Sequence, residues 1–430
     1  MAQETAVNGD RGTRARGDGG PAEAADAAKP ADAAKPAEAA GPAEPADAAG
    51  SAEPADAAGS AEGPEAAAPA PAQDPYAPEV VATAGDVPAD ALSPLLVLDV
   101  VERFLDAHGI GTGPVTAARI GDGHSNVTFR VTRDGADVVL RRGPRPPLPR
   151  SAHDMVREAR IQQALAGHGV PVPQILAVCD DEDLLGVPFY VMGHLDGDVI
   201  TDEEPARIQT PEPRRAVAMD MVDTLVALHS IDVSAPPVAD LGRPSGYLDR
   251  QVATFRRLWD VNTQRSVPDV VRVADLLAAD VPRTQRHAVV HGDYRLGNLM
   301  IEGSGAPRVK AILDWEMATL GDPLADVGYL LANYSEAGSP TSALDLSPVT
   351  RRDGYPTAAE LAERYADASG LDLGDLGWYR ALAYWKSAVF CEAMYTRYLA
   401  GERPGDDFAP QLETGVPELA RRALEALGDA

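Results

Sequence analysis

Residues 291–298 of the chain read His291-Gly292-Asp293-Tyr294-Arg295-Leu296-Gly297-Asn298, and residues 312–316 read Ile312-Leu313-Asp314-Trp315-Glu316. Four residues separate Asp293 from Asn298, and Asp314 follows sixteen positions later, at the end of an apolar segment. A carboxylate can accept the proton of an attacking hydroxyl. An amide oxygen and a second carboxylate are ligands that Mg²⁺ prefers. The three side chains therefore suit one site that joins a proton acceptor to a magnesium ion.

The spacing His-x-Asp-x-x-x-x-Asn matches the catalytic loop of kinases, with Gly292 where those loops usually carry arginine. It predicts phosphoryl transfer from a nucleotide, with Asp293 as the catalytic base. Asn298 and Asp314 are the predicted magnesium ligands. His291 belongs to the same catalytic segment, and we expect it to hold the loop by hydrogen bonds rather than to titrate. The alternative for Asp293 is a carboxylate that only caps a turn.

Residues 1–75 differ in composition from the rest of the 430-residue chain. They consist almost entirely of Ala, Pro, Gly, Glu, Asp and a few Lys, and short units recur, such as residues 26–31 and 32–37. Apart from alanine, they offer almost no apolar surface to offset their chain entropy. We expect a disordered acidic tail, because frequent proline excludes a continuous alanine-rich helix.

The formal net charge of −28 makes nucleic acid and anionic membranes poor partners and favours small molecules. The two cysteines, Cys179 and Cys391, provide no disulfide framework and are typical of a reducing compartment. No apolar run reaches the length of a membrane span, and the first residues lack a signal-peptide core. We therefore expect a cytoplasmic protein.

Hydrophobic periodicity predicts an α+β fold with a small strand-rich lobe and a larger helical lobe. The expected strands are residues 116–120, 127–131, 138–141, 174–178 and 188–192, of which the first three form an antiparallel sheet. The expected helices include residues 96–105, a helix from a capping box at Ser151 to about Leu165, and a core helix over 214–230. The predicted lobes are residues 90–193 and 194–430, joined by a connection near residues 192–197.

Together these features resemble the aminoglycoside phosphotransferase and choline kinase family, which has a two-lobed, protein-kinase-like fold. The motifs are residues 291–298, and Asp314 with Gly321-Asp322-Pro323-Leu324-Ala325-Asp326. The resemblance covers roughly residues 95–400, and its motifs are most similar to the subset associated with acyl-CoA dehydrogenases. It implies that Asp326 supports the backbone of the catalytic loop and that Asp322 caps the following helix.

The small lobe holds the predicted nucleotide contacts. They are the turn residues Gly121, Gly123, His124, Ser125 and Asn126, the strand residue Arg141, its helix partner Glu158, and the hinge residue Met192. Glycine lets backbone N–H groups approach phosphates closely, and arginine offers a fork of donors to phosphate oxygens. Strand alternation leaves open whether Arg141 or Arg142 faces the phosphates, and the alternative for Glu158 is a solvated side chain. Backbone groups of residues 192–194 are expected to read the adenine edge, so ATP is the expected cofactor with Mg²⁺, and GTP stays open.

Members of the resembling subset are thought to phosphorylate hydroxylated acids or their coenzyme A esters, which implies a hydroxyacid or hydroxyacyl-CoA acceptor. Arg351–Arg352 or Arg421–Arg422 could contact coenzyme A phosphates. The alternative is an aminoglycoside, choline or amino sugar, because an acidic protein suits a cation. Two further hypotheses are a catalytically silent nucleotide-binding scaffold and a protein kinase. The latter is disfavoured because no Ala-Pro-Glu segment follows Asp314. His229, Cys391 and the aromatic residues between Trp378 and Tyr398 are expected to pack in the core.

Overall fold

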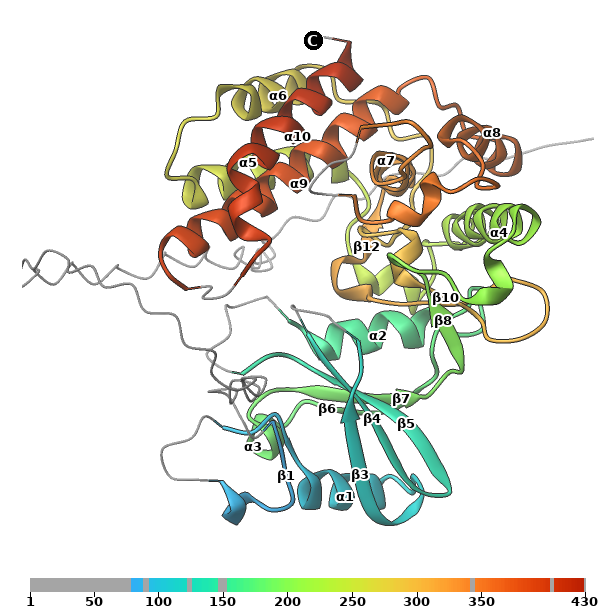
Figure 1. Cartoon of the computed structure of the whole chain (residues 1–430), viewed down its shortest axis with the longest axis vertical. Coiled ribbons are helices and arrows are strands. Elements are labelled where there is room, and N and C mark those ends of the chain that lie inside the picture. The colour runs from blue at the N-terminus through green and yellow to red at the C-terminus, as the bar shows by residue number, and fades with distance from the viewer. Residues whose placement is uncertain are drawn as a thin grey trace, which may run out of the picture. The chain divides into compact units, whose positions relative to one another are not determined.

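The computed structural model describes residues 79–87, 93–121, 126–145, 153–340, 345–402 and 406–428. The predicted disordered tail, the predicted helix start at Ser151, and Gly123, His124 and Ser125 of the predicted glycine turn lie outside these residues. In the described part, a strand-rich lobe and a helical lobe belong to one compact unit (Figure 1). The predicted two-lobed α+β fold is confirmed.

A five-stranded antiparallel sheet forms the small lobe. In spatial order its strands are β3 (Thr112–Arg119), β4 (Val127–Asp134), β5 (Ala136–Arg142), β7 (Phe189–Gly193) and β6 (Ile175–Cys179). A tight turn at Gly135, which has a φ of +75°, joins β4 to β5. The prediction of a three-stranded sheet was too small, because β7 pairs with β5 and extends the same sheet. Only local turns can be recognised from sequence, and α2 separates β5 from β6 along the chain.

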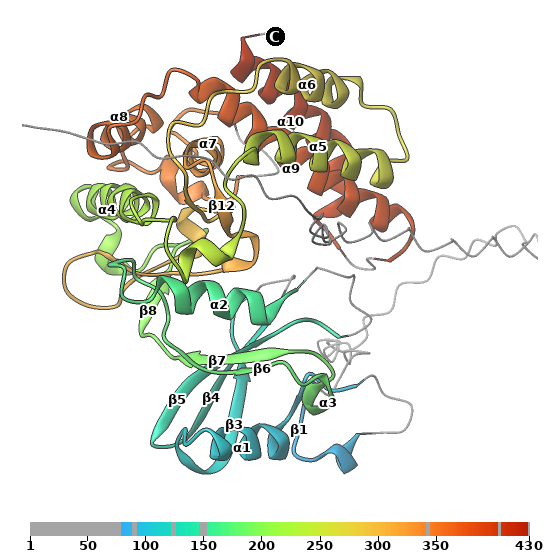
Figure 2. The same cartoon turned by 180° about the vertical axis from the view of Figure 1, so that it is seen from behind.

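Helices cover both faces of this sheet. α1 (Leu98–Ala107) packs on the face where Leu140 and Val191 are fully buried. α2 (Met155–Leu165) packs on the other face, against Tyr190. Successive side chains of a strand point to opposite faces, so the neighbours Tyr190 and Val191 belong to different layers. Figure 2 shows α2 between the sheet and the large lobe.

The large lobe is mainly helical and has one extensive hydrophobic core. Its helices are α4 (Pro211–His229), α5 (Tyr247–Asn262), α6 (Pro268–Ala279), α7 (Leu324–Ala332), α8 (Ala358–Ser369), α9 (Leu376–Leu399) and α10 (Leu412–Leu427). Its short strands are β8 (Gly197–Val199), β9 (Ala288–Val290), β10 (Leu299–Glu302), β11 (Val309–Ile312) and β12 (Thr319–Gly321). They form the sheets β11-β10-β8 and β12-β9, from whose ends the catalytic segments extend. Three short elements complete the small lobe: β1 (Val80–Val81), its parallel partner β2 (Leu96–Val97), and α3 (Glu182–Leu185).

The remaining predictions of local structure can be compared with these bounds. The predicted core helix is confirmed as α4, and β10 pairs with β11 in an antiparallel hairpin. α2 begins only after Asp154, whose carboxylate caps it by accepting from the N–H of Arg157. Most of the predicted aromatic cluster is buried, as in Trp378 and Trp385. No helix in the described ranges is long and apolar enough to cross a membrane. The division of the lobes at residues 193 and 194 stays a prediction.

Candidate active site

A cleft of about 280 Å³ lies between the two lobes. The predicted site residues that line it are Gly121, Asn126, Arg141, Glu158, Met192, Asn298 and Asp314. The first five come from the small lobe and the last two from the large lobe. Asp293 and His291 are not among the residues that line this cleft, but they adjoin it through Asn298. The fold therefore gathers residues that the sequence separates widely.

Arg141 lines the cleft and contacts residues of both lobes. Its Nη2 donates to Oδ1 of Asp314 over 2.6 Å, and its Nε lies 3.1 Å from Oε1 of Glu158. Burial alone would lower the pKa of Arg141, but the charge of Glu158 raises it above its ordinary value. Arg142 points to the opposite face of β5, where its guanidinium donates to the carbonyls of Gly143 and Leu95. Of the two candidates, Arg141 is the one that faces the cleft.

Glu158 of α2 forms a buried ion pair with Arg141. Its side chain is only 1% exposed, so the alternative of a solvated glutamate is wrong. The hydroxyl of Tyr190 donates to its Oε1 over 3.1 Å, and Gln162 in turn donates to that hydroxyl. Burial raises the pKa of Glu158, and the positive charge of Arg141 opposes that rise. The cation is thus fixed by a buried hydrogen-bond network on α2 and β7.

The catalytic loop connects β9 to β10 and is held by the ring of His291. Nε2 of His291 lies 2.9 Å from the carbonyl oxygen of Leu313, and Nδ1 accepts from the N–H of Asp293 over 3.2 Å. Both ring nitrogens therefore bind backbone, as expected for a residue that positions the loop. Gly292 has a φ of +87°, and a Cβ there would lie 2.9 Å from the Cβ and the carbonyl oxygen of Met317. This contact excludes arginine at the position where kinases usually carry it.

Asp326 fixes the same loop from inside the core. Its carboxylate accepts from the backbone N–H groups of His291 over 2.7 Å and of Gly292 over 2.8 Å. His229 contacts the carboxylate through Nε2 at 3.1 Å, and its Nδ1 contacts the hydroxyl of Tyr365 at 2.7 Å. Burial alone would raise the pKa of Asp326, but the hydrogen bond and charge of His229 hold it below its ordinary value. The expectation that His229 only packs was incomplete, because α4 and α7 meet at this polar contact.

Asp322 contributes a second polar contact at the start of α7. Its Oδ1 accepts from the N–H of Leu324 over 3.0 Å, and its Oδ2 accepts from the hydroxyl of Tyr379 over 3.0 Å. The carboxylate thus caps the helix, in agreement with the expected geometry. Tyr379 lies on α9, so the same cap joins the loop to the longest helix of the lobe.

Asn298 holds the carboxylate of Asp293. Its Nδ2 donates to the Asp293 carbonyl oxygen over 2.8 Å and to Oδ2 over 2.6 Å, which leaves its Oδ1 with no donor among the described residues. Oδ1 of Asp293 is buried and has no hydrogen-bond partner in the described ranges, and the same is true of Nε of Arg295. These two atoms form an ion pair with each other at a distance of 3.5 Å. The sequence interpretation did not single out Arg295, although its position two residues after Asp293 was visible.

Asp314 follows β11 in a left-handed conformation, with a φ of +63°. Such a backbone is strained for a residue other than glycine. The preceding residue is fixed to the catalytic loop, because the N–H of Leu313 donates to the carbonyl of Asn298 over 2.8 Å. Asn298 and Asp314 therefore present an amide and a carboxylate oxygen to one cleft. Mg²⁺ is usually held by one or two such ligands together with phosphates and water, so the pair fits that ion. No cluster of three or more His, Cys, Asp or Glu side chains suited to a metal occurs in the described ranges.

The sequence profile of the phosphotransferase enzyme family matches residues 116–382, which is more than half of the chain. The chain belongs to this phosphotransferase family. The family resemblance expected from the motifs is thereby confirmed, and all the site residues described above lie within the matched region.

Similar proteins agree with this assignment. Acyl-CoA dehydrogenase family member 10 of Mus musculus is 34% identical over 74% of this chain, which spans 29% of that protein. The chain spans less than half the length of the first curated relatives that it matches. A Ralstonia eutropha protein assigned to the aminoglycoside phosphotransferases is 27% identical, with a TM-score of 0.66 over 77% of this chain and 98% of that one. A thermostable aminoglycoside phosphotransferase APH(4)-Ia, solved with ADP and hygromycin B, has a TM-score of 0.50 at 18% identity, over 75% of this chain and 98% of that one. The predicted kinase-like fold is confirmed by these likenesses.

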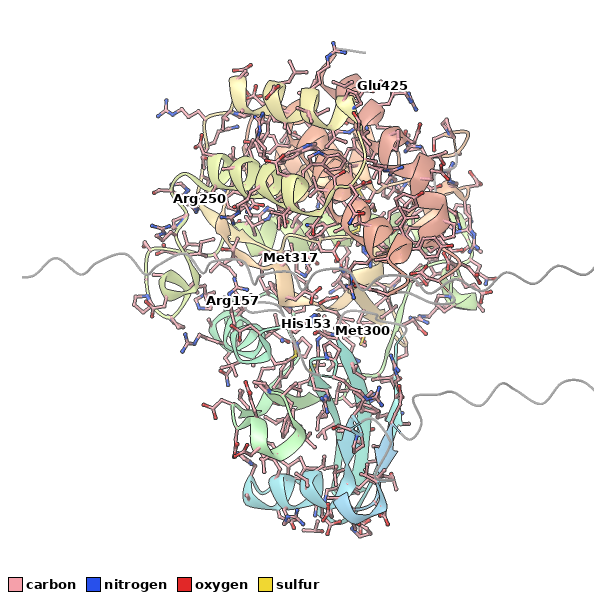
Figure 3. The ribbon with its side chains drawn as sticks, turned by 90° about the vertical axis from the view of Figure 1, so that its left-hand side faces the viewer. His153, Arg157, Arg250, Met300, Met317 and Glu425 are labelled. Carbon is pink, nitrogen blue, oxygen red and sulfur yellow. The ribbon has the colours of Figure 1, made fainter. Side chains whose placement is uncertain are left out.

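In this phosphotransferase the lobes are also joined beside the cleft. Asn126 donates to Oε2 of Glu316 over 2.8 Å, and its Oδ1 lies 2.8 Å from Nδ1 of His153. Arg157 of α2 donates to the carbonyls of Glu316 and Ala318. Figure 3 shows His153, Arg157 and Met317 where the small and large lobes meet. Glu316 could not be recognised as a contact from sequence, because its partner Asn126 lies far away along the chain.

Two of the three backbone N–H groups of the predicted hinge, residues 192–194, donate to other residues of the small lobe that are not on this segment. Met192 lines the cleft, but the N–H of Gly193 donates to Gln174 and that of His194 to Asp137. The N–H of Leu195, another lining residue, makes no backbone hydrogen bond in the described part of the chain. The available backbone donor is therefore one residue beyond the predicted segment 192–194.

Proposed function

We propose that this phosphotransferase moves the γ-phosphoryl group of Mg·ATP to a hydroxyl of a small molecule, with Asp293 as the catalytic base. The observation that supports this most is the setting of the Asp293 carboxylate: Nδ2 of Asn298 donates to its Oδ2 over 2.6 Å, while its Oδ1 makes no hydrogen bond among the described residues and only an ion pair with Nε of Arg295 at 3.5 Å. An acceptor hydroxyl can donate to a carboxylate oxygen, and a phosphate oxygen can accept from a guanidinium. The two reactants of a phosphoryl transfer would satisfy both atoms.

In the proposed step, the acceptor oxygen bonds to the γ-phosphorus while the bond from that phosphorus to the β,γ-bridging oxygen breaks. ADP leaves with the electron pair, and the hydroxyl proton passes to Asp293 and then to solvent. Arg141 contacts the donor phosphates with its fork of donors. Asn298 and Asp314 would hold the magnesium ion, which neutralises phosphate charge when bound. During this step His291 holds the catalytic loop in position through its ring nitrogens.

We propose ATP as the donor on two grounds. A protein of the same fold was solved with ADP. In this chain Leu195 lines the cleft and its N–H makes no backbone hydrogen bond among the described residues, so this N–H is our candidate donor to the adenine edge. GTP is the alternative donor, and a nucleotide competition assay separates the two.

For the acceptor we propose a hydroxyacid or a hydroxyacyl-CoA, because relatives of this chain are named as acyl-CoA dehydrogenase family members. Since the chain spans less than half of those proteins, their whole activity is not carried over. An aminoglycoside, choline or amino sugar is the second candidate, favoured by the net charge of −28. A silent scaffold is disfavoured because the catalytic side chains contact one another. The cytoplasmic location is likewise proposed, from the cysteine content.

The test is transfer of labelled γ-phosphate from Mg·ATP to a panel of hydroxyacids, hydroxyacyl-CoA esters, choline and aminoglycosides. Transfer to one acceptor class, lost in Asp293→Asn, is the expected result. Absence of transfer to every acceptor, with Mg·ATP still bound, would favour the silent scaffold.

A further inference from the structure

Arg295, two residues after the proposed base, carries a half-buried guanidinium that makes no hydrogen bond in the described part of the chain. Its one ion pair there joins Nε to Oδ1 of Asp293 at 3.5 Å. Nε also lacks a partner in Arg133, Arg207 and Arg351, but those guanidinium groups donate through Nη atoms to carboxylates or carbonyls. A guanidinium has five N–H donors, so Arg295 keeps donors available for a ligand.

Gly297 shows where this guanidinium lies. A Cβ at Gly297 would overlap Nη1 of Arg295 and would lie 3.3 Å from its Cζ, so the guanidinium fills the space that a side chain at 297 would take. Gly297 lines the nucleotide cleft together with Asn298, a proposed magnesium ligand. Since Nε of the same group lies beside Asp293, Arg295 reaches from the proposed base to a residue in the wall of the cleft.

Arg141 and Arg295 pair with different parts of the site. Arg141 comes from the small lobe and is paired with both Glu158 and Asp314. Arg295 comes from the catalytic loop and is paired with the base, where the acceptor hydroxyl is expected. During phosphoryl transfer, negative charge is spread over the three equatorial oxygens of the group that passes from donor to acceptor. A cation beside the base therefore comes closer to that charge as the transfer proceeds.

We propose that Arg295 is a further catalytic residue, whose guanidinium donates to the equatorial phosphoryl oxygens in the transition state, between Asp293 and Gly297. The bond from the acceptor oxygen to the γ-phosphorus forms, the bond to the β,γ-bridging oxygen breaks, and the hydroxyl proton passes to Asp293. Arg295 keeps its protons throughout. A contact that is stronger in the transition state than with bound substrate raises kcat and leaves KM almost unchanged. The inference rests on the proposed phosphoryl transfer, which supplies the moving group.

Two other roles for Arg295 make different predictions. If its charge only balances that of Asp293, Arg295→Lys should be as active as the wild type. If it binds an anionic group of the acceptor, its loss should raise the KM for the acceptor and spare kcat. A contact with two phosphoryl oxygens instead needs the planar fork of arginine, which the ammonium of lysine cannot reproduce.

The experiment measures kcat and the KM values for ATP and acceptor, with the acceptor that gives the highest rate in the panel above. Arg295→Gln should lower kcat about 10²–10³-fold, as the loss of one preorganised donor to a transition state does, and should change the KM for ATP little. Arg295→Lys should also lower kcat, by a smaller factor. Arg256→Gln, which removes an exposed arginine paired with Asp275, is the control and should keep the wild-type values. Thermal unfolding of each variant shows whether it has folded.

A further variant displaces the guanidinium without removing it. Gly297→Ala places a methyl group where Nη1 of Arg295 lies. It should lower kcat about tenfold or more, since a misplacement of about 1 Å can cost about 10²-fold in rate. In the Arg295→Gln background the same change should have no further effect, because changes that act through one contact are not additive. An equal loss of kcat in both backgrounds would mean that Gly297 acts on the nucleotide directly, and would contradict the assigned role of the guanidinium.

A binding measurement with Mg·ADP and aluminium fluoride tests the same contact without turnover. Aluminium fluoride beside ADP imitates the phosphoryl group in the transition state, so it should tighten the binding of ADP to the wild type. Arg295→Gln should lose most of that gain, while its Kd for Mg·ADP alone stays at the wild-type value. A gain that persists in Arg295→Gln would contradict the inference.

The kinetic outcomes separate this inference from the proposed function. If the wild type transfers phosphate and Asp293→Asn does not, but Arg295→Gln keeps kcat within a few-fold of the wild type, the inference is wrong and the function stands. The same conclusion follows if Arg295→Gln raises only the KM for the acceptor, or if Arg295→Lys is fully active. If the wild type transfers phosphate to no acceptor, the proposed function is wrong and the inference falls with it.

Discussion

Arg141 donates from Nη2 to Oδ1 of Asp314 over 2.6 Å, so a strand of the small lobe is tied to a residue two positions after β11 of the large lobe. The cation and the carboxylate belong to opposite walls of the cleft. Both would face the nucleotide phosphates, the first as a donor and the second through magnesium. This contact links the relative position of the lobes to the proposed chemistry.

Arg141→Met removes the partner of the buried Glu158. Leaving a buried charge unpaired costs about 3 kcal/mol or more. We expect a lower free energy of unfolding of that order, and at least a tenfold rise in the KM for ATP. Adding Glu158→Gln should restore much of the stability but not the KM, as chemical denaturation and steady-state kinetics would show. If the double variant is no more stable than the single one, Glu158 is not the source of the cost.

Asn298→Ala tests the metal site. Because even partners behind metal ligands contribute about 10–100-fold to metal affinity, we expect the Mg²⁺ concentration for half-maximal rate to rise at least tenfold. Asn262→Ala is the matched control, since that side chain only donates to Leu258 within α5. A magnesium titration of both variants that gives the wild-type midpoint would remove Asn298 from the metal site.

Asp326→Asn should loosen the catalytic loop, because an amide cannot accept from both backbone N–H groups and His229. Each buried group left without a partner costs about 1–3 kcal/mol. The lowered pKa of Asp326 stabilises the fold above its ordinary pKa of 3.8, and this contribution is lost as the pH falls through the lower folded value. The free energy of unfolding should be measured at pH 7 and below pH 4. The decrease between these two pH values should be smaller for the variant than for the wild type. Asp275→Asn, in an exposed ion pair with Arg256, should leave both values unchanged.

Lys386 of α9 has its ammonium 4.7 Å from the centre of the Phe255 ring. Burial lowers its pKa from 10.5 to about 8, against the charges of Asp326 and Asp293. Between these values the unfolded chain keeps a proton that the folded chain has released, so the stability conferred by this group rises with pH across that window. We expect Lys386→Met to remove a rise on the order of 1–3 kcal/mol. Lys310→Met, whose ammonium pairs with Glu302, should keep it.

The proximity of Asp293, Asn298 and Asp314 could be predicted from sequence because the three residues are close together in the chain. They lie within one hairpin and its flanking loops, and their catalytic roles stay a proposal. Local turns such as Asp134-Gly135 also identify strand pairs, since a tight turn limits how the chain can return.

Features that join distant parts of the chain could not be predicted in the same way. Alternation along β5 could not decide between Arg141 and Arg142, because the direction of a strand face depends on which helix covers it. The contact of His229 with Asp326 joins α4 to α7, and that of Asn126 with Glu316 joins the two lobes. The residues next to each of these side chains in the sequence do not indicate which distant residue it will contact.

The most direct measurement is the rate of γ-phosphoryl transfer by Asp293→Asn, with Asp275→Asn as the control. If Asp293 is the base, kcat should fall about 10²–10⁴-fold while the affinity for Mg·ATP stays at the wild-type value. The control should keep full activity, since Asp275 lies in an exposed pair. A variant that keeps kcat within a few-fold of the wild type would contradict the proposed mechanism.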